Sequence, residues 1–198
     1  MSKSYYQEGA WWASPFNEKP EVQKEALPGR PVEIHDATLR DGEQTPGVVF
    51  SKEDKLHIAE KLIEAGVTRI EAGMPAVSRQ DFEAMYEIAR RFPEAKIFSF
   101  ARATHGDIDM AADCGAKGVV IETPVGYPKL KYQFHWDVEK VLEKSADSIR
   151  YARSKGLYAV YFPYDATRAR EEDIETLFNG LVQNDARPDS IGVVDTMG

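Results

Sequence analysis

Residues 32–73 read VEIHDATLRDGEQTPGVVFSKEDKLHIAEKLIEAGVTRIEAG, and this stretch carries one full repeat of the fold. It holds an apolar run, a polar loop, a segment of helical length and a second apolar run. Ser51 followed by Asp54 forms an N-cap pattern, and Gly66 supplies the left-handed residue that often ends a helix. The apolar side chains of this segment fall on one helical face: Leu56, Ala59, Leu62 and Ile63. The stretch therefore predicts a strand, a helix and a second strand.

The same alternation continues through the rest of the sequence. Strands are expected at 32–35, 69–72, 96–100, 118–122, 157–162 and 191–195. Helices are expected between them at 52–65, 79–91, 106–114, 137–155 and 171–183. Strands that alternate with helices indicate a parallel sheet built from βα units.

The spacing of the strands favours one parallel architecture over another. Strand starts lie about 32 residues apart, which is the repeat of a (β/α)₈ TIM barrel of roughly 250 residues. Residues 32–198 would then form about the first six strands of an incomplete barrel. The alternative is an open, doubly wound sheet of six parallel strands, which fits the length as it stands. That alternative lacks a glycine-rich phosphate loop after the first strand.

Residues 1–31 form a separate leader rich in proline and aromatic residues. They contain four of the eleven prolines and no helical or alternating apolar pattern, so an irregular segment is expected. Its aromatic residues make it too apolar for a disordered tail: Tyr5, Tyr6, Trp11, Trp12 and Phe16. These side chains are expected to pack on the outside of the domain or on a second subunit.

Composition excludes several classes of partner. The 25 Lys and Arg residues are outnumbered by 33 Asp and Glu residues, and the net charge of −8 argues against nucleic acid and anionic membrane surfaces. No apolar run approaches the roughly 18 residues that span a bilayer. A single cysteine, Cys114, fits a reducing compartment and is expected to be a small buried residue, not a nucleophile. A cytoplasmic protein is the prediction.

The chemistry of a parallel α/β fold lies at the carboxyl ends of its strands, and the first such exit is HDATLRDGEQ at 35–44. An Arg next to an Asp can hold an anionic substrate and a hard cation together. The guanidinium binds a carboxylate in a bidentate fashion, and the carboxylate offers oxygen to Mg²⁺ or Mn²⁺. The structural alternative is a solvated loop in which Asp36 or Thr38 caps a turn.

Several strand exits share motifs with one enzyme family. DATLRDGEQTPGVVFS at 36–51 resembles the opening signature of the isopropylmalate synthase, homocitrate synthase and HMG-CoA lyase family of metal-dependent TIM barrels (the HMGL-like, or DRE-TIM metallolyase, group). Further resemblance lies in EAGMPAVSRQDFEA at 71–84, ARATHGDIDMAAD at 101–113, DATRA at 165–169 and VVDTMG at 193–198. The form RDGEQTPGV is closer to the synthase branch than to the lyase branch.

The resemblance implies catalytic and metal-binding roles for three residues. Asp41 matches the metal-binding carboxylate, which would hold Mg²⁺, Mn²⁺ or Zn²⁺, and its structural alternative is a loop cap. Arg40 matches the arginine that neutralises the developing enolate or alkoxide oxygen. Glu71 resembles an acid that orients Arg40, and a plain ion pair between them is the alternative.

The resemblance also implies substrate contacts. Gln44 matches a residue near the substrate carboxylate, and Thr196 matches a threonine that hydrogen-bonds the 2-oxo acid. Arg102 is a candidate contact from the third strand. The structural alternative is a loop hydrogen bond for Gln44 and an ordinary strand end for Thr196. For Arg102 it is a structural ion pair.

The sequence departs from the family pattern at three points. The His-x-His pair that supplies the other metal ligands is absent, so the natural protein is expected to continue past Gly198. The synthases have Thr-Ser and His before a similar Lys-Tyr pair, and counting back from Lys131-Tyr132 places Gly126 and Lys129 at the Ser and His positions, with Tyr127 between them. This change alters the wall around the 2-oxo acid, and a packed loop aromatic is the alternative for Tyr127. Asp165 follows Tyr164 where the synthases have Glu-Asp, and it is the candidate general base, with a turn or N-cap aspartate as the alternative.

The resulting hypothesis is an acyltransferase of amino-acid biosynthesis that condenses acetyl-CoA, as co-substrate, with a 2-oxo acid in an alkylmalate- or homocitrate-type reaction. A homodimer is implied by the resemblance. One alternative is a metal-dependent carbon-carbon lyase of the HMG-CoA lyase type, which Pro163-Tyr164-Asp165 favours. The other is a non-catalytic partial barrel, which the missing His-x-His pair favours.

Overall fold

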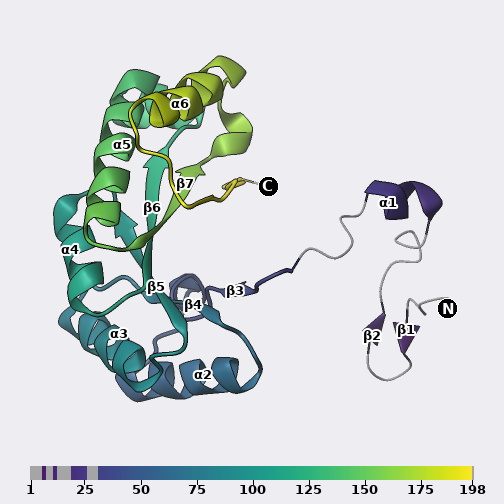
Figure 1. Ribbon diagram of the computed structural model, residues 1–198, viewed down its shortest axis with the longest axis vertical. Coiled ribbons are helices and arrows are strands. Elements are labelled where there is room, and N and C mark those ends of the chain that lie inside the picture. Colours follow the sequence, from purple (N-terminus) through teal and green to yellow (C-terminus); the bar gives the residue numbers. More distant parts are fainter. Residues whose placement is uncertain (1–5, 8–10, 13–18, 26–30, 198) are drawn as a thin grey trace. The chain divides into compact units, whose positions relative to one another are not determined.

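The computed structural model describes residues 6–7, 11–12, 19–25 and 31–197. The chain divides into two compact units, Met1–Val32 and Glu33–Gly198. Figure 1 shows both units.

The described residues of the first unit form three short elements in a segment where the sequence pattern predicts none. Strands β1 (Tyr6–Gln7) and β2 (Trp11–Trp12) pair in antiparallel fashion, and helix α1 spans Pro20–Glu25. Each element is too short to produce a periodic signal. Proline suits the first position of α1 because its missing N–H has no partner there in any helix. The predicted packing of the leader aromatics lies outside the described side chains.

The second unit contains a six-stranded parallel sheet whose strand order follows the chain. Its strands are β3 (His35–Asp36), β4 (Arg69–Gly73), β5 (Lys96–Arg102), β6 (Gly118–Pro124), β7 (Tyr158–Tyr164) and β8 (Ser190–Ile191). Sequential order in a parallel sheet is the arrangement of a barrel, whereas an open, doubly wound sheet reverses its order. The predicted partial barrel is therefore confirmed.

The helices follow the expected pattern within one residue at each end. They are α2 (Lys52–Glu64), α3 (Arg79–Arg91), α4 (His105–Asp113), α5 (Val138–Ser154) and α6 (Glu171–Gln183). Ser51 and Asp54 form a complete capping box at the start of α2. Figure 1 shows the helices on the outer side of the strands. Among the described residues, no helix is both long and apolar enough to cross a membrane.

The two outer strands are shorter than the apolar runs predict. Residues 32–35 reduce to a two-residue β3, and residues 191–195 reduce to a two-residue β8 followed by one isolated bridge between Tyr164 and Val194. Each outer strand has one neighbour in this sheet, so backbone hydrogen bonds form along one side. Ile34 is accordingly exposed in spite of its apolar side chain.

The two faces of the sheet have different surroundings. Along β6, Val119 and Ile121 pack in the core that the helices cover, while Val120 faces the inner side with Phe98 and Phe100. Gly118 starts this strand because a Cβ there would lie 2.4 Å from the Phe98 ring. The inner side is thus lined by aromatic and branched side chains, and Glu71 on β4 and Glu122 on β6 lie on it nearer the carboxyl ends of the strands.

Candidate active site

The loop after β3 is folded back on itself by its own backbone. The carbonyl of Ala37 accepts hydrogen bonds from the N–H groups of Arg40 (3.1 Å) and Asp41 (2.8 Å). Asp36 accepts from the backbone N–H of Thr38 at 2.9 Å and from its hydroxyl at 3.1 Å, which is the predicted capped turn. This turn directs Arg40 toward the inner face of the sheet.

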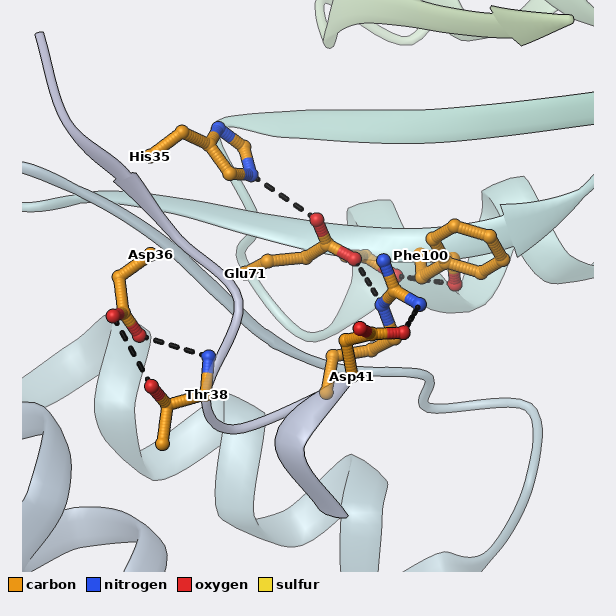
Figure 2. Close-up of polar contacts among 8 residues, drawn as sticks. His35, Asp36, Thr38, Asp41, Glu71 and Phe100 are labelled. Atoms are coloured by element: carbon orange, nitrogen blue, oxygen red, sulfur yellow. Dashed lines mark hydrogen bonds and ion pairs between the residues drawn. The ribbon is translucent and has the colours of Figure 1, made fainter. Parts of the chain in front are cut away.

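Arg40 joins two carboxylates and an aromatic ring. Its Nε donates to Glu71 Oε1, its Nη1 donates to Asp41 Oδ1 at 2.9 Å, and its Cζ lies 4.2 Å from the centre of the Phe100 ring. Glu71 is buried, and its other oxygen lies 3.1 Å from His35 Nε2 (Figure 2). The structure therefore brings Arg40, Asp41 and Glu71 together, and the guanidinium is held in one orientation by its partners and by the ring beneath it.

Asp41 remains accessible, with 65% of its side chain exposed. Among residues 31–197 and the other described positions, no cluster of three or more His, Cys, Asp or Glu side chains is arranged to hold a metal ion. A divalent cation needs more ligands than one carboxylate supplies. The described residues therefore do not fit a complete metal centre, and the role of Asp41 stays a prediction.

Gln44 shares a cavity with Arg40. The cavity has a volume of about 350 Å³ and is lined by Arg40, Glu43, Gln44, Gly73, Met74, Val77 and Asp81. Its walls come from the loop after β3, from the end of β4 and from α3. A small anionic molecule in this cavity would lie beside the Arg40 guanidinium and within reach of the Gln44 amide.

A buried lysine holds this loop against two helices. Lys55 Nζ on α2 lies 2.6 Å from Glu43 Oε2 and 2.5 Å from Asp81 Oδ1 on α3, and 3% of the Lys55 side chain is exposed. Glu43 also accepts the backbone N–H of Phe50 at 3.0 Å. Burial acts to lower the pKa of Lys55, but its hydrogen bonds to Asp81 and Glu43 outweigh burial and raise that pKa. Lys55 is therefore a charged clamp that the sequence pattern does not reveal.

Replacing Lys55 by methionine is expected to lower the free energy of unfolding by about 2 kcal/mol, because two partly buried carboxylates lose their charged hydrogen-bond partner. Urea unfolding measures the change. Lys61→Met, which removes an exposed pair with Glu64, is the matched control and should cost less than about 1 kcal/mol. Equal losses in the two variants would contradict the clamp.

Asp165 and Thr196 are also joined. The Asp165 carboxylate is fully buried and accepts from Arg168 Nε and Nη2, both at 2.8 Å. Its backbone N–H donates to Thr196 Oγ1 at 2.9 Å. Asp165 has a left-handed φ of 63°, so the chain turns sharply after β7. The general-base role of Asp165 stays a prediction, and this bidentate ion pair does not support it.

Arg102 and Tyr127 have partners of their own. Arg102 Nε and Nη2 each donate to Asp107 at 2.9 Å, which is the structural ion pair named as its alternative. Tyr127 accepts a hydrogen bond from Lys131 Nζ at 2.8 Å, and the guanidinium of Arg170 lies 5.0 Å from its ring centre. Their predicted contacts with substrate stay predictions.

Sequence reasoning missed Glu122, which lies on β6. Burial and the nearby Glu71 carboxylate raise its pKa, against the opposing effect of Arg40 and Lys129. Burial, with Glu122 and Asp165 nearby, raises the pKa of Tyr164 to about 12. A signal for Glu122 was present in the sequence, because Glu122 is a lone acid toward the end of an otherwise apolar run.

Cys114 behaves as predicted. Its side chain is buried at the end of α4, and its thiol donates to the backbone carbonyl of Ala111. Burial raises the pKa of Cys114 to about 11, so the thiol stays protonated near neutral pH and is unsuited to nucleophilic attack.

Comparison with known proteins places these features in context. The HMGL-like family model matches residues 31–198. A probable 2-isopropylmalate synthase from Ignicoccus hospitalis is 41% identical over 174 residues, which are 88% of this chain and 43% of that protein. Homocitrate synthase AksA from Methanocaldococcus jannaschii is 36% identical over 200 residues, which are 100% of this chain and 47% of that protein. The chain spans less than half the length of these relatives.

Solved structures agree with the fold. A hydroxymethylglutaryl-CoA lyase from Pseudomonas aeruginosa has a TM-score of 0.67 at 18% identity, over 84% of this chain and 59% of that one. An HMG-CoA lyase from Acinetobacter baumannii, in complex with coenzyme A and 3-methylmalate, has a TM-score of 0.68 at 14% identity, over 84% of this chain and 57% of that one. At such identities the likeness concerns the fold alone.

Proposed function

Because this chain belongs to the HMGL-like family, we propose that its protein condenses the acetyl group of acetyl-CoA with a 2-oxo acid, as an alkylmalate- or homocitrate-type synthase does. The observation that carries the proposal is the similarity to synthases, with identities near 40% over most of this chain. Such a reaction needs a fixed positive charge where an enolate or alkoxide oxygen develops. Arg40 supplies that charge beside the cavity that Gln44 lines.

Each residue around Arg40 has a part in this proposal. Glu71 and Phe100 hold the guanidinium in place, so little reorganisation is needed when negative charge appears on the substrate. Gln44 would donate its amide to the carboxylate of the 2-oxo acid. Thr196 would face the same substrate from the segment that follows β8, where its hydroxyl accepts the backbone N–H of Asp165.

The remaining parts of the proposal rest on the family alone. A divalent cation, Mg²⁺, Mn²⁺ or Zn²⁺, would polarise the ketone of the 2-oxo acid, and the described residues supply one candidate ligand for it, Asp41. Acyl-CoA and the 2-oxo acid are the proposed partners. A homodimer, a cytoplasmic location and a place in amino-acid biosynthesis belong to the same proposal.

Release of free CoA tests the proposed function. The full-length protein is incubated with acetyl-CoA, a panel of 2-oxo acids and each divalent cation in turn, and free thiol is measured. CoA release that requires both a 2-oxo acid and a cation is the expected result. No release with any member of the panel would contradict the synthase. Metal-dependent cleavage of a 3-hydroxyacyl-CoA in a parallel arm would favour the lyase instead.

A further inference from the structure

Several carboxylates lie near the carboxyl ends of the strands or in the loops that follow them. Those around Arg40 and Arg168 have a cationic partner at hydrogen-bond distance: Asp41 and Glu71 both bind Arg40, and Asp165 binds Arg168. Glu122 on β6 has no hydrogen bond or ion pair with any residue in the part of the chain that the structure describes. The lone pairs of the Glu122 carboxylate are therefore available to a substrate.

The position of Glu122 places it at the proposed reacting site. On β6 it pairs in register with Arg102 of β5 and Phe162 of β7, and it follows Val120 on the inner face by the two-residue repeat of a strand. The charged and titratable groups that act on it come from four neighbouring segments, namely Arg40 after β3, Glu71 on β4, Lys129 after β6 and Tyr164 on β7. Arg40 is the group that would hold the enolate oxygen.

We propose that Glu122 is the general base that takes a proton from the carbon next to the thioester carbonyl of the acyl-CoA, an inference that rests on the function proposed above. The C–H bond breaks and an O–H bond forms on Glu122, while the electron pair moves to the carbonyl oxygen that faces Arg40. The enolate carbon then forms the new C–C bond with the ketone of the 2-oxo acid. Glu122 returns its proton to the resulting alkoxide oxygen, so that the carboxylate is regenerated. Water then hydrolyses the thioester of the product: the C–S bond breaks, a C–O bond forms, and CoA leaves as the free thiol that the assay measures.

Electrostatics favours Glu122 over Asp165 for this task. Both oxygens of the Asp165 carboxylate already accept a hydrogen bond from the Arg168 guanidinium, so they are occupied by that partner. Glu122 is half-buried without such a partner, and burial raises its pKa, which strengthens it as a base. Glu122 would stay deprotonated above its raised pKa, so the kcat for CoA release should fall as the pH drops through that pKa.

The test compares Glu122→Gln, Glu122→Asp and the wild type in the full-length protein, with CoA release as the assay. Glutamine keeps the size of the side chain but cannot accept the proton. For Glu122→Gln we expect kcat to fall by about 10²–10³-fold, with KM for both substrates within about threefold of the wild type. With deuterated acetyl-CoA, the isotope effect on kcat should rise, because proton transfer becomes slower. Glu122→Asp keeps a base at a longer distance and should give an intermediate kcat.

Glu143→Gln is the matched control, because Glu143 is exposed on α5 and pairs with Lys140. Its kcat and KM should equal those of the wild type. A kcat for Glu122→Gln within threefold of the wild type would show that Glu122 is not the general base. An unchanged isotope effect together with a large rise in KM would show the same. Should Glu122→Gln not fold, a kcat for Glu122→Asp equal to the wild type would overturn it. If the proposed synthase activity is wrong, the wild type itself releases no CoA, and this result is distinct from the loss in Glu122→Gln. The assignment of Glu122 is then overturned as well.

Discussion

Replacing Arg40 by lysine is expected to lower the kcat for CoA release by about 10²–10³-fold, the usual loss when one fixed donor to a developing oxyanion is removed. Lysine keeps the positive charge, but all its donors lie on one nitrogen, whereas Arg40 binds Glu71 and Asp41 through two different nitrogens of a planar group. It also loses the flat contact of the guanidinium with the Phe100 ring. The charge then shifts away from the reacting oxygen.

The control for this experiment is Arg79→Lys, because Arg79 is almost fully exposed on α3 and pairs with Glu83. Its kcat should equal that of the wild type. Steady-state CoA release measures both variants, and thermal unfolding confirms that each is folded. A kcat for Arg40→Lys within threefold of the wild type would show that the guanidinium has no special part in the reaction.

Replacing Gly126 by alanine is expected to lower the free energy of unfolding by about 3 kcal/mol, within the range for breaking a buried ion pair. An added Cβ would lie 2.0 Å from Asp165 Oδ2, so the carboxylate must leave its position. Asp165 is fully buried and bound to Arg168, and it has no room to move without losing that pair. The added Cβ would therefore break the ion pair between Asp165 and Arg168.

Gly106→Ala provides the comparison. Gly106 lies in the first turn of α4, and no atom lies within 4 Å of a Cβ built there. Alanine is the better helix former, so Gly106→Ala should leave the stability unchanged or raise it by up to about 1 kcal/mol. Urea unfolding of both variants gives the two free energies. A loss of less than about 1 kcal/mol for Gly126→Ala would contradict the tight fit between Gly126 and Asp165.

Local signals in the sequence account for much of this fold. The N-caps at Ser51 and Asp137 and the left-handed glycines at Gly66 and Gly156 mark helix ends through contacts within a few residues. Such contacts join residues that are close in the sequence, so the sequence alone reveals them. The lengths of the two outer strands were overestimated because a strand also needs a neighbouring strand. An apolar residue such as Ile34 does not indicate whether that neighbour is present.

The site was predictable where a motif carried it. Arg40, Asp41 and Glu71 were expected together, and the structure joins them. Lys55 was missed because its partner Asp81 lies far along the chain, on another helix. A lysine on a helix normally reaches solvent, and only the packing of α2 against α3 shows that Lys55 is enclosed.

The sequential strand order also bears on how the chain reaches its native state. Every strand from β4 onward pairs with the strand made immediately before it, so the sheet can grow one βα unit at a time in the order of synthesis. Each pairing closes a loop of only a few tens of residues, and the entropy cost of such a loop rises slowly with its length. Arg40 lies in the loop after β3 and Glu71 lies on β4, so their ion pair joins the first βα unit to the next strand. This central contact of the proposed site can therefore form before the later strands leave the ribosome.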